Sequence, residues 1–109
     1  MKKASELTDD EIRVMIAEDQ GWTDIWHGEH TGIFTGCCPL SKKDQLISNY
    51  PADLNAIHEV ENVLIAQGLW VECSTRLGWV GAAPDRRILH ATARQRCEAY
   101  LITKGLALP

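Results

Sequence analysis

Three segments of the chain space their apolar residues at intervals of three and four, as a helix with one buried face does. The segments follow Thr8, Pro51 and Thr92. Each is expected to turn its apolar side chains toward a common core and its polar positions toward solvent. The apolar positions are Ile12, Met15 and Ile16 in the first segment, Leu54, Ile57, Leu64 and Ile65 in the second, and Ala93, Cys97, Tyr100 and Leu101 in the third.

Two of these segments begin with the spacing of a capping box. Thr8 stands three residues before Glu11, and Thr92 stands three residues before Gln95. In a capping box the threonine hydroxyl accepts a hydrogen bond from the backbone N–H three residues on, and the side chain at that position reaches back. The sequence therefore predicts that the first helix starts at Thr8 and the last one at Thr92.

The start of the middle helix is predicted from a proline instead of a capping box. Pro51 suits the first turn of a helix, which is expected to run over residues 53–67. Gly21, Gly68 and Gly105 follow the three periodic segments, and glycine readily takes the left-handed conformation that ends a helix. Both ends of each helix are therefore predicted from local signals.

Short runs of strand-favouring residues lie between the second and third helices. Residues 69–74 and 77–81 predict a hairpin with a tight connection, and Ile88–Leu89 is a further candidate strand. A two-stranded hairpin is only marginally stable unless something packs on it, and amphipathic helices supply that cover. The predicted fold class is α+β, with three helices packed on a small antiparallel β-sheet or hairpin.

Residues 22–50 show neither a helical nor an alternating period. Glycine recurs through this stretch and Pro39 interrupts it, which predicts a long irregular loop. Residues 31–35 are a candidate short strand within it. Ordered loops of this length in small domains are often functional, so the stretch is a candidate site.

Composition describes one domain over residues 1–109, without repeat or linker. The chain is 45% hydrophobic and carries a formal net charge of −4, with its basic residues dispersed. A nucleic-acid partner calls for a concentrated basic face, so it is not expected. Neither a secretory signal nor an apolar stretch of about 18 residues is seen, so we expect a cytoplasmic protein with reduced thiols and no membrane partner.

Four potential zinc ligands lie in the irregular stretch: His27, His30, Cys37 and Cys38. Zinc prefers nitrogen and sulfur ligands in a tetrahedral arrangement. The spacing is not a standard one, because adjacent cysteines rarely bind the same ion. In the alternative interpretation both histidines are solvated and Cys38 packs beside Pro39, and no cofactor is expected.

Three aromatic residues form the other candidate site. Trp22 and Trp26 are four residues apart, and Phe34 follows in the same stretch. Exposed together, they would form an apolar patch for a partner protein. The alternative is that the tryptophans anchor the stretch in the core.

A catalytic set is not apparent. His58 lies near Glu59 and Glu61, the latter being the one acidic interruption of the second apolar stripe. A histidine beside carboxylates can titrate near neutral pH, but a surface or capping role is the simpler interpretation. No group of residues supplies a nucleophile, a base and a stabilising donor together, so we expect no enzyme.

The order of these elements resembles that of the phage ABA sandwich domain, a family of small phage and prophage proteins. The resemblance spans about residues 7–106 and implies an α/β/α layered sandwich, in the order helix, loop or strand, helix, two strands, helix. It implies a phage-encoded protein in the cytoplasm of the host cell and brings no assigned catalytic residues. The residues that carry it are Gly21-Trp22, Tyr50-Pro51-Ala52-Asp53, Ile57, Glu59, Val60, Glu61 and residues 91–99.

Together these observations favour a non-enzymatic interaction protein. It is expected to bind a host or phage protein and to modulate host defence or metabolism. The alternative is a small-ligand or metal-binding module that uses residues 22–38. Self-association into a homo-oligomer stays open.

Overall fold

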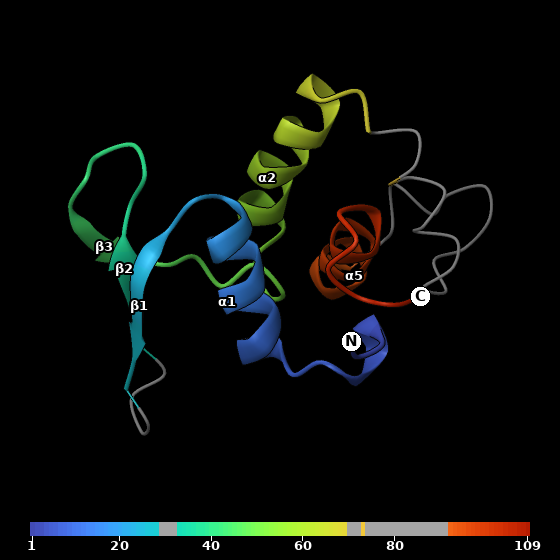
Figure 1. Cartoon of the computed structure of the whole chain (residues 1–109), viewed down its shortest axis with the longest axis horizontal. Coiled ribbons are helices and arrows are strands. Elements are labelled where there is room, and N and C mark those ends of the chain that lie inside the picture. Colours follow the sequence, from blue (N-terminus) through green and yellow to red (C-terminus); the bar gives the residue numbers. More distant parts are fainter. Residues whose placement is uncertain (29–32, 70–72, 74–91) are drawn as a thin grey trace.

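The structure, a computed structural model, describes residues 1–28, 33–69, 73 and 92–109. In chain order they form a short 3-10 helix, η1, a helix, three strands and two further helices (Figure 1). The expected α+β class is confirmed, because the described residues form three α-helices and a three-stranded antiparallel sheet. The elements are η1 (Ala4–Glu6), α1 (Asp9–Asp19), β1 (Thr23–His27), β2 (Phe34–Cys37), β3 (Asp44–Leu46), α2 (Leu54–Ala66) and α5 (Ala93–Thr103).

Both predicted capping boxes are present. The Thr8 hydroxyl accepts from Glu11 N at 3.1 Å, and the Glu11 carboxylate accepts from Thr8 N at 3.1 Å. The Thr92 hydroxyl accepts from Gln95 N at 3.1 Å, and the Gln95 side chain accepts from Thr92 N at 2.9 Å. These bonds satisfy backbone N–H groups that have no partner within the helix, so α1 and α5 begin where the sequence predicted.

Helix α2 covers the predicted range to within one residue at each end, but Pro51 is not in its first turn. Its N-cap is Asp53, whose carboxylate accepts from Asn55 N at 3.0 Å and from Ala56 N at 3.3 Å. Pro51 lies in the preceding turn, so its placement in the first helical turn was wrong. Asp53 determines where the helix starts, because its carboxylate accepts hydrogen bonds from two backbone N–H groups of the first turn. A proline side chain has no acceptor for these groups.

The buried face of α2 is also rotated from the predicted stripe. Leu54 and Ile65 are exposed, whereas Ala56 and Val60 are buried beside Ile57. Two neighbouring faces of this helix are apolar, one with Leu54 and Ile65 and one with Ala56 and Val60, and Ile57 lies between them. The face with Val60 is buried where α2 packs against α5.

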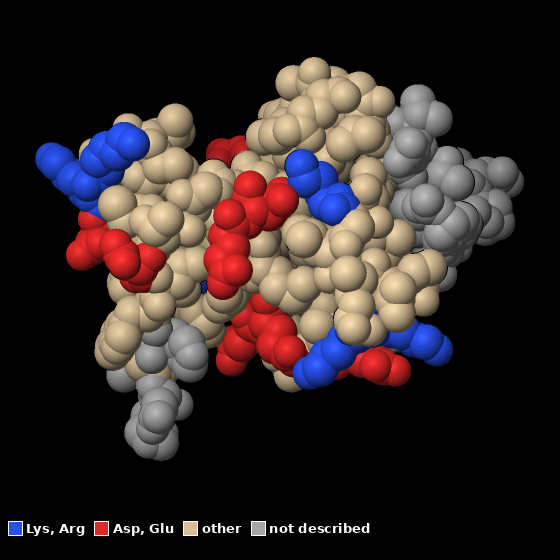
Figure 2. Space-filling model, viewed as in Figure 1, with Lys and Arg blue, Asp and Glu red and all other residues tan. Residues whose placement is uncertain are grey.

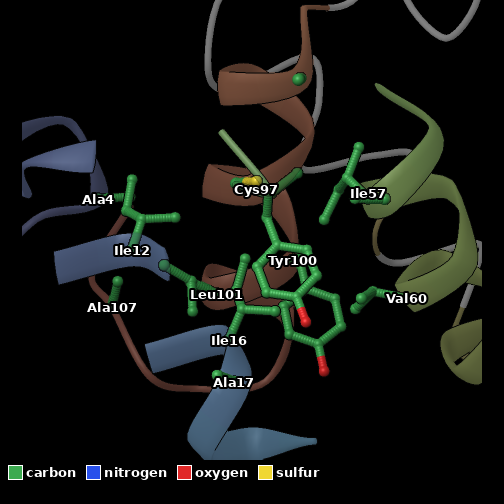
Figure 3. Packing of buried hydrophobic residues seen from close by; sticks show 14 of the residues in the cluster. Ala4, Ile12, Ile16, Ala17, Ile57, Val60, Cys97, Tyr100, Leu101 and Ala107 are labelled. Atoms are coloured by element: carbon green, nitrogen blue, oxygen red, sulfur yellow. The ribbon is translucent and has the colours of Figure 1, made fainter. Parts of the chain in front are cut away.

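Helix α5 is the centre of the fold. It packs against α1, α2 and η1. In Figure 3, Tyr100 and Leu101 of α5 lie between Ile16 of α1 and the Ile57 and Val60 pair of α2. Because it has neighbours on several sides, α5 is buried well beyond a single stripe. Its buried residues are Ala93, Arg96, Cys97, Glu98, Ala99, Tyr100, Leu101 and Ile102.

Residues 22–50 are not the irregular loop that was predicted. They contain the antiparallel sheet, in the order β1-β2-β3, which stands beside α1 (Figure 1). The strands are short, and a bulge between Thr23 and Trp26, with Asp24 at φ 52°, breaks the alternation that marks a strand. Of the candidate strand over 31–35, residues 31 and 32 lie outside the described residues, and β2 begins at Phe34.

The predicted hairpin falls largely outside the described residues, as does the candidate strand Ile88–Leu89. Leu69 and Cys73 are described, and Cys73 N donates to Leu69 O at 3.0 Å. Cys73 itself is helical, so the strand predicted over 69–74 is wrong at this residue.

Arg13 joins the sheet to α1. Its guanidinium lies 4.3 Å from the centroid of the Phe34 ring, and its Nη2 donates to Ile47 O. One side chain thus makes a cation–π contact with β2 and a hydrogen bond to the segment that follows β3.

Arg94 joins the N-terminal segment to α5. Its Nη2 donates to Leu7 O at 2.6 Å and to Ala4 O at 3.2 Å, and its Nη1 donates to Asp9 Oδ1 at 2.5 Å. Its Nε donates to Glu98 Oε1 at 3.2 Å. The planar fork of a guanidinium is suited to such divergent acceptors.

We expect Arg94→Ala to lower the free energy of unfolding by about 2 kcal/mol, because two main-chain carbonyls lose a charged donor. Arg94→Lys should recover only part of this, since an ammonium lacks the fork. Lys2→Ala, which removes an exposed ion pair with Glu11, should change it by less than about 0.5 kcal/mol. Urea unfolding measures all three, and equal effects of Arg94→Ala and Lys2→Ala would contradict the assignment.

Candidate functional site

An apolar row crosses the outer face of the sheet. Trp26 of β1 pairs with Thr35 of β2, which pairs with Leu46 of β3. Side chains that are direct cross-strand neighbours lie on the same face. Trp26 is 60% exposed and Leu46 is 70% exposed. We call Trp26, Thr35 and Leu46 the outer row.

Phe34 does not belong to this surface. It is 3% exposed and lies under the Arg13 guanidinium, in the same core cluster as Ile47. Its prediction as part of an exposed patch was wrong, because consecutive strand residues point to opposite faces and Phe34 precedes Thr35. Leu46 takes its place, and sequence reasoning missed it because β3 is too short to show an alternating pattern.

Trp22 does not lie on the outer face of the sheet either. It is half-buried and packs against the hydrophobic core, so the anchoring interpretation holds for this tryptophan. The bulge in β1 lies between the two residues. Of the three predicted aromatic residues, Trp26 alone is on the outer face of the sheet.

A cleft of about 470 Å³ opens where Trp22 meets α2. Apolar and aromatic side chains form most of its wall, with a hydroxyl at Ser48 and a carboxylate at Glu59. Such a mixture suits a small, mainly apolar ligand held by a few polar contacts. We call this space the cleft; its lining includes Trp22, Cys38, Ser48, Tyr50, Glu59 and Val63.

The Cys38 thiol at the edge of the cleft has an unusual environment. Backbone hydrogen bonds from Ser41 and Leu40 lower its pKa below the ordinary value. The turn that supplies them is closed by Lys42 N, which donates to Cys38 O at 2.9 Å, and by Cys38 N, which donates to Lys43 O at 2.9 Å. Hydrogen bonds to the charged form favour it, so this thiol ionises more readily than a free cysteine.

The predicted metal ligands are described only in part. His30 lies outside the described residues, and of His27 only the backbone is described. Cys38 lines the cleft, whereas Cys37 is half-buried at the end of β2. Within the described ranges, no three His, Cys, Asp or Glu residues gather as a metal site requires. The four-residue zinc site stays a prediction.

A buried ion pair joins α2 to α5. Arg96 Nη1 lies 3.0 Å from each Glu61 carboxylate oxygen, and the two residues are 4% and 2% exposed. His58 Nδ1 lies 3.3 Å from Glu61 Oε1. Burial raises the pKa of Glu61, while the charge of Arg96 opposes that shift. Glu61 stood out in the sequence as the acid within an apolar stripe, but nothing there indicated Arg96 as its partner.

Cys73, whose thiol is affected by the Glu61 charge, is not suited to nucleophilic chemistry. Cys73 is fully buried, and burial together with the Glu61 charge raises its pKa to about 11. At neutral pH such a thiol is almost entirely protonated. The contacts among His58, Glu61 and Arg96 hold α2 against α5, which is a structural role.

Comparisons with known proteins yield no relative. No protein-family model, no curated protein and no solved structure matches the chain. In the part of the chain that the structure describes, no helix has the length and apolar character needed to span a membrane.

We expect the folded protein to react with iodoacetamide at Cys38 well before Cys97. The pKa of Cys38 is lowered by hydrogen bonds, whereas burial raises that of Cys97, so the thiolate fraction at pH about 8 favours Cys38. Peptide mapping by mass spectrometry after timed labelling measures the order. Labelling in urea is the control, and it should make the two sites similar. Early modification of Cys97 in the folded protein would contradict the assignment.

Proposed function

We propose that this chain is a non-catalytic protein-binding domain. In this proposal it is encoded by a phage, acts in the cytoplasm of the host cell and binds a host or phage protein, modulating host defence or metabolism. The phage origin rests on the resemblance to the phage ABA sandwich domain. The binding activity rests on the outer row.

The observation that carries the proposal is the exposure of Trp26 and Leu46 on one face of the sheet. A large aromatic and a branched aliphatic side chain there cost little conformational entropy to bury and offer much apolar area. Thr35 between them adds a hydroxyl at the centre of the row. Single exposed apolar residues are common, but two in register across the same sheet form a contiguous anchor for a partner.

The charge beside the outer row indicates the chemistry of the partner. Lys42 and Lys43 lie in the loop that leads into β3, and both are exposed. Figure 2 shows Lys and Arg side chains at the end of the molecule where the sheet stands, with Asp and Glu side chains beside them. The expected partner has an apolar centre that covers Trp26 and Leu46 and an acidic rim that faces the two lysines.

Capture from a lysate of infected host cells tests the outer row. Trp26→Ala and Leu46→Ala should each reduce recovery of the captured protein by at least about tenfold, because both remove apolar anchor area. Ile65→Ala is the matched control, since Ile65 is 53% exposed on α2, away from the sheet. Capture should be unchanged with this variant, and the midpoint of urea unfolding should be close to that of the parent in all three.

Two results would count against this proposal. One is capture that is insensitive to Trp26→Ala and Leu46→Ala. The other is a dimer of the pure protein that dissociates when Trp26 is replaced, as sedimentation velocity would show. That dimer would assign the outer row to a second copy of the chain.

A second candidate function is supported by the cleft. Its volume and its mainly apolar wall suit a small ligand, so the domain would then be a ligand-binding module. Trp22 and Cys38, both within the stretch that the sequence singled out, contribute to the wall.

Ligand binding in the cleft should raise the melting temperature of the protein, because a ligand that binds only the folded state stabilises it. A panel of small aromatic and aliphatic acids, amides and alcohols provides the probes. Val63→Glu, which places a charge in the apolar wall, should abolish any shift that the parent shows. A flat response of the parent across the panel, or a shift that survives Val63→Glu, would remove this candidate.

A further inference from the structure

Helix α1 carries a repeated pattern on one face. Two rows of residues four apart read acid, apolar, acid. Residues four apart on a helix lie on the same side, and adjacent rows are neighbours, so all six side chains share one face. The rows are Asp10-Val14-Glu18 and Glu11-Met15-Asp19.

This face is hollowed over much of its length. One hollow of about 300 Å³ is lined by Val14, Met15 and Phe34 together with the acids of the first turn. A second of about 300 Å³ is lined by Met15 and Leu106 together with the acids of the last turn. Met15 lines both hollows, so they adjoin along α1 and together present apolar side chains with acids at each end. We call the two hollows together the α1 groove.

The charge of the α1 groove is only partly neutralised within the chain. Glu11 pairs with Lys2 at 3.1 Å, and Asp19 lies 3.7 Å from Lys104. Asp10 and Glu18 are exposed and form no ion pair with the described residues. Figure 2 shows Asp and Glu side chains gathered in a band over α1.

The last turn of α1 is an unfavourable position for Glu18 and Asp19. The C-terminal end of a helix is the negative end of its dipole, where carboxylates cost stability and cations gain it. Glu18 and Asp19 nevertheless lie there, and the last turn has no basic residue. Lys104 and the Tyr100 hydroxyl offset this cost at Asp19. A cationic partner would offset it at Glu18, which is a second reason to expect one beside the charge pattern.

We propose that the α1 groove binds a basic amphipathic helix of a partner protein. Apolar side chains of that helix, spaced three and four apart, would cover Val14 and Met15. Lysine or arginine on its flanks would face Asp10 and Glu18. This surface is distinct from the outer row, so the inference does not depend on the function proposed above.

A designed peptide tests the inference directly. The probe is a fluorescein-labelled peptide of about 15 residues, with leucine on one helical face and lysine on the other. Fluorescence anisotropy should detect binding to the parent protein that weakens as salt rises from about 0.01 M to about 0.1 M. A peptide of the same composition in scrambled order should bind at least about tenfold more weakly, because it lacks the apolar stripe.

Matched protein variants locate the binding. Asp10→Lys with Glu18→Lys should weaken binding by at least about tenfold, because both residues are exposed and face the peptide's lysines. Met15→Ser should also weaken it, because both hollows lose their shared floor. Asp44→Lys with Glu59→Lys makes the same change in net charge elsewhere and should leave the affinity within about twofold.

Several outcomes would overturn the inference. No binding to the parent, equal binding of the scrambled peptide, or no effect of Met15→Ser would each do so. Equal weakening by the two charge-reversal pairs would reduce the interaction to general charge attraction. A dimer of the pure protein that Asp10→Lys with Glu18→Lys dissociates would assign the α1 groove to a second copy. Retained peptide binding by Trp26→Ala separates this result from the test of the outer row.

Discussion

Burial of α5 on several sides is the constraint on which the rest of the structure depends. A helix with neighbours on several sides must satisfy the polar side chains that it buries, since an unpaired buried charge costs far more than a paired one. Glu61 of α2 therefore meets Arg96, and the pair fixes how α2 lies on α5. At the other end of α5, the Tyr100 hydroxyl donates to Asp19 and accepts from Gln20, which fixes α1.

The sheet is attached to this helical unit mainly through one face. Phe34 and Ile47 lie in the core. Arg13 of α1 makes a cation–π contact with Phe34 of β2 and donates a hydrogen bond to Ile47 O, just after β3. Because consecutive residues alternate, burying Phe34 obliges Thr35 to face outward together with its neighbours Trp26 and Leu46. The same packing that anchors the sheet thus produces its exposed apolar face.

Two surfaces of opposite character result from this arrangement. The outer row is apolar and adjoins the lysines of the β2–β3 loop, whereas the α1 groove combines an apolar floor with carboxylates at both ends. In the two proposals above, each surface binds a different partner, and charge selects that partner before apolar contacts form. Both surfaces lie on regular elements, so their side chains are held in place by the core.

The sequence by itself determined the features that depend on a few neighbouring residues. The capping boxes at Thr8 and Thr92 were predictable because a threonine and its partner three residues on make the same hydrogen bonds in any protein. Tertiary structure decided the sheet within residues 22–50, the exposure of Leu46 and the pairing of Glu61 with Arg96, which are 35 positions apart. Short strands leave no periodic trace, and an acid within an apolar stripe does not indicate its partner, so only the packing of distant segments settles them.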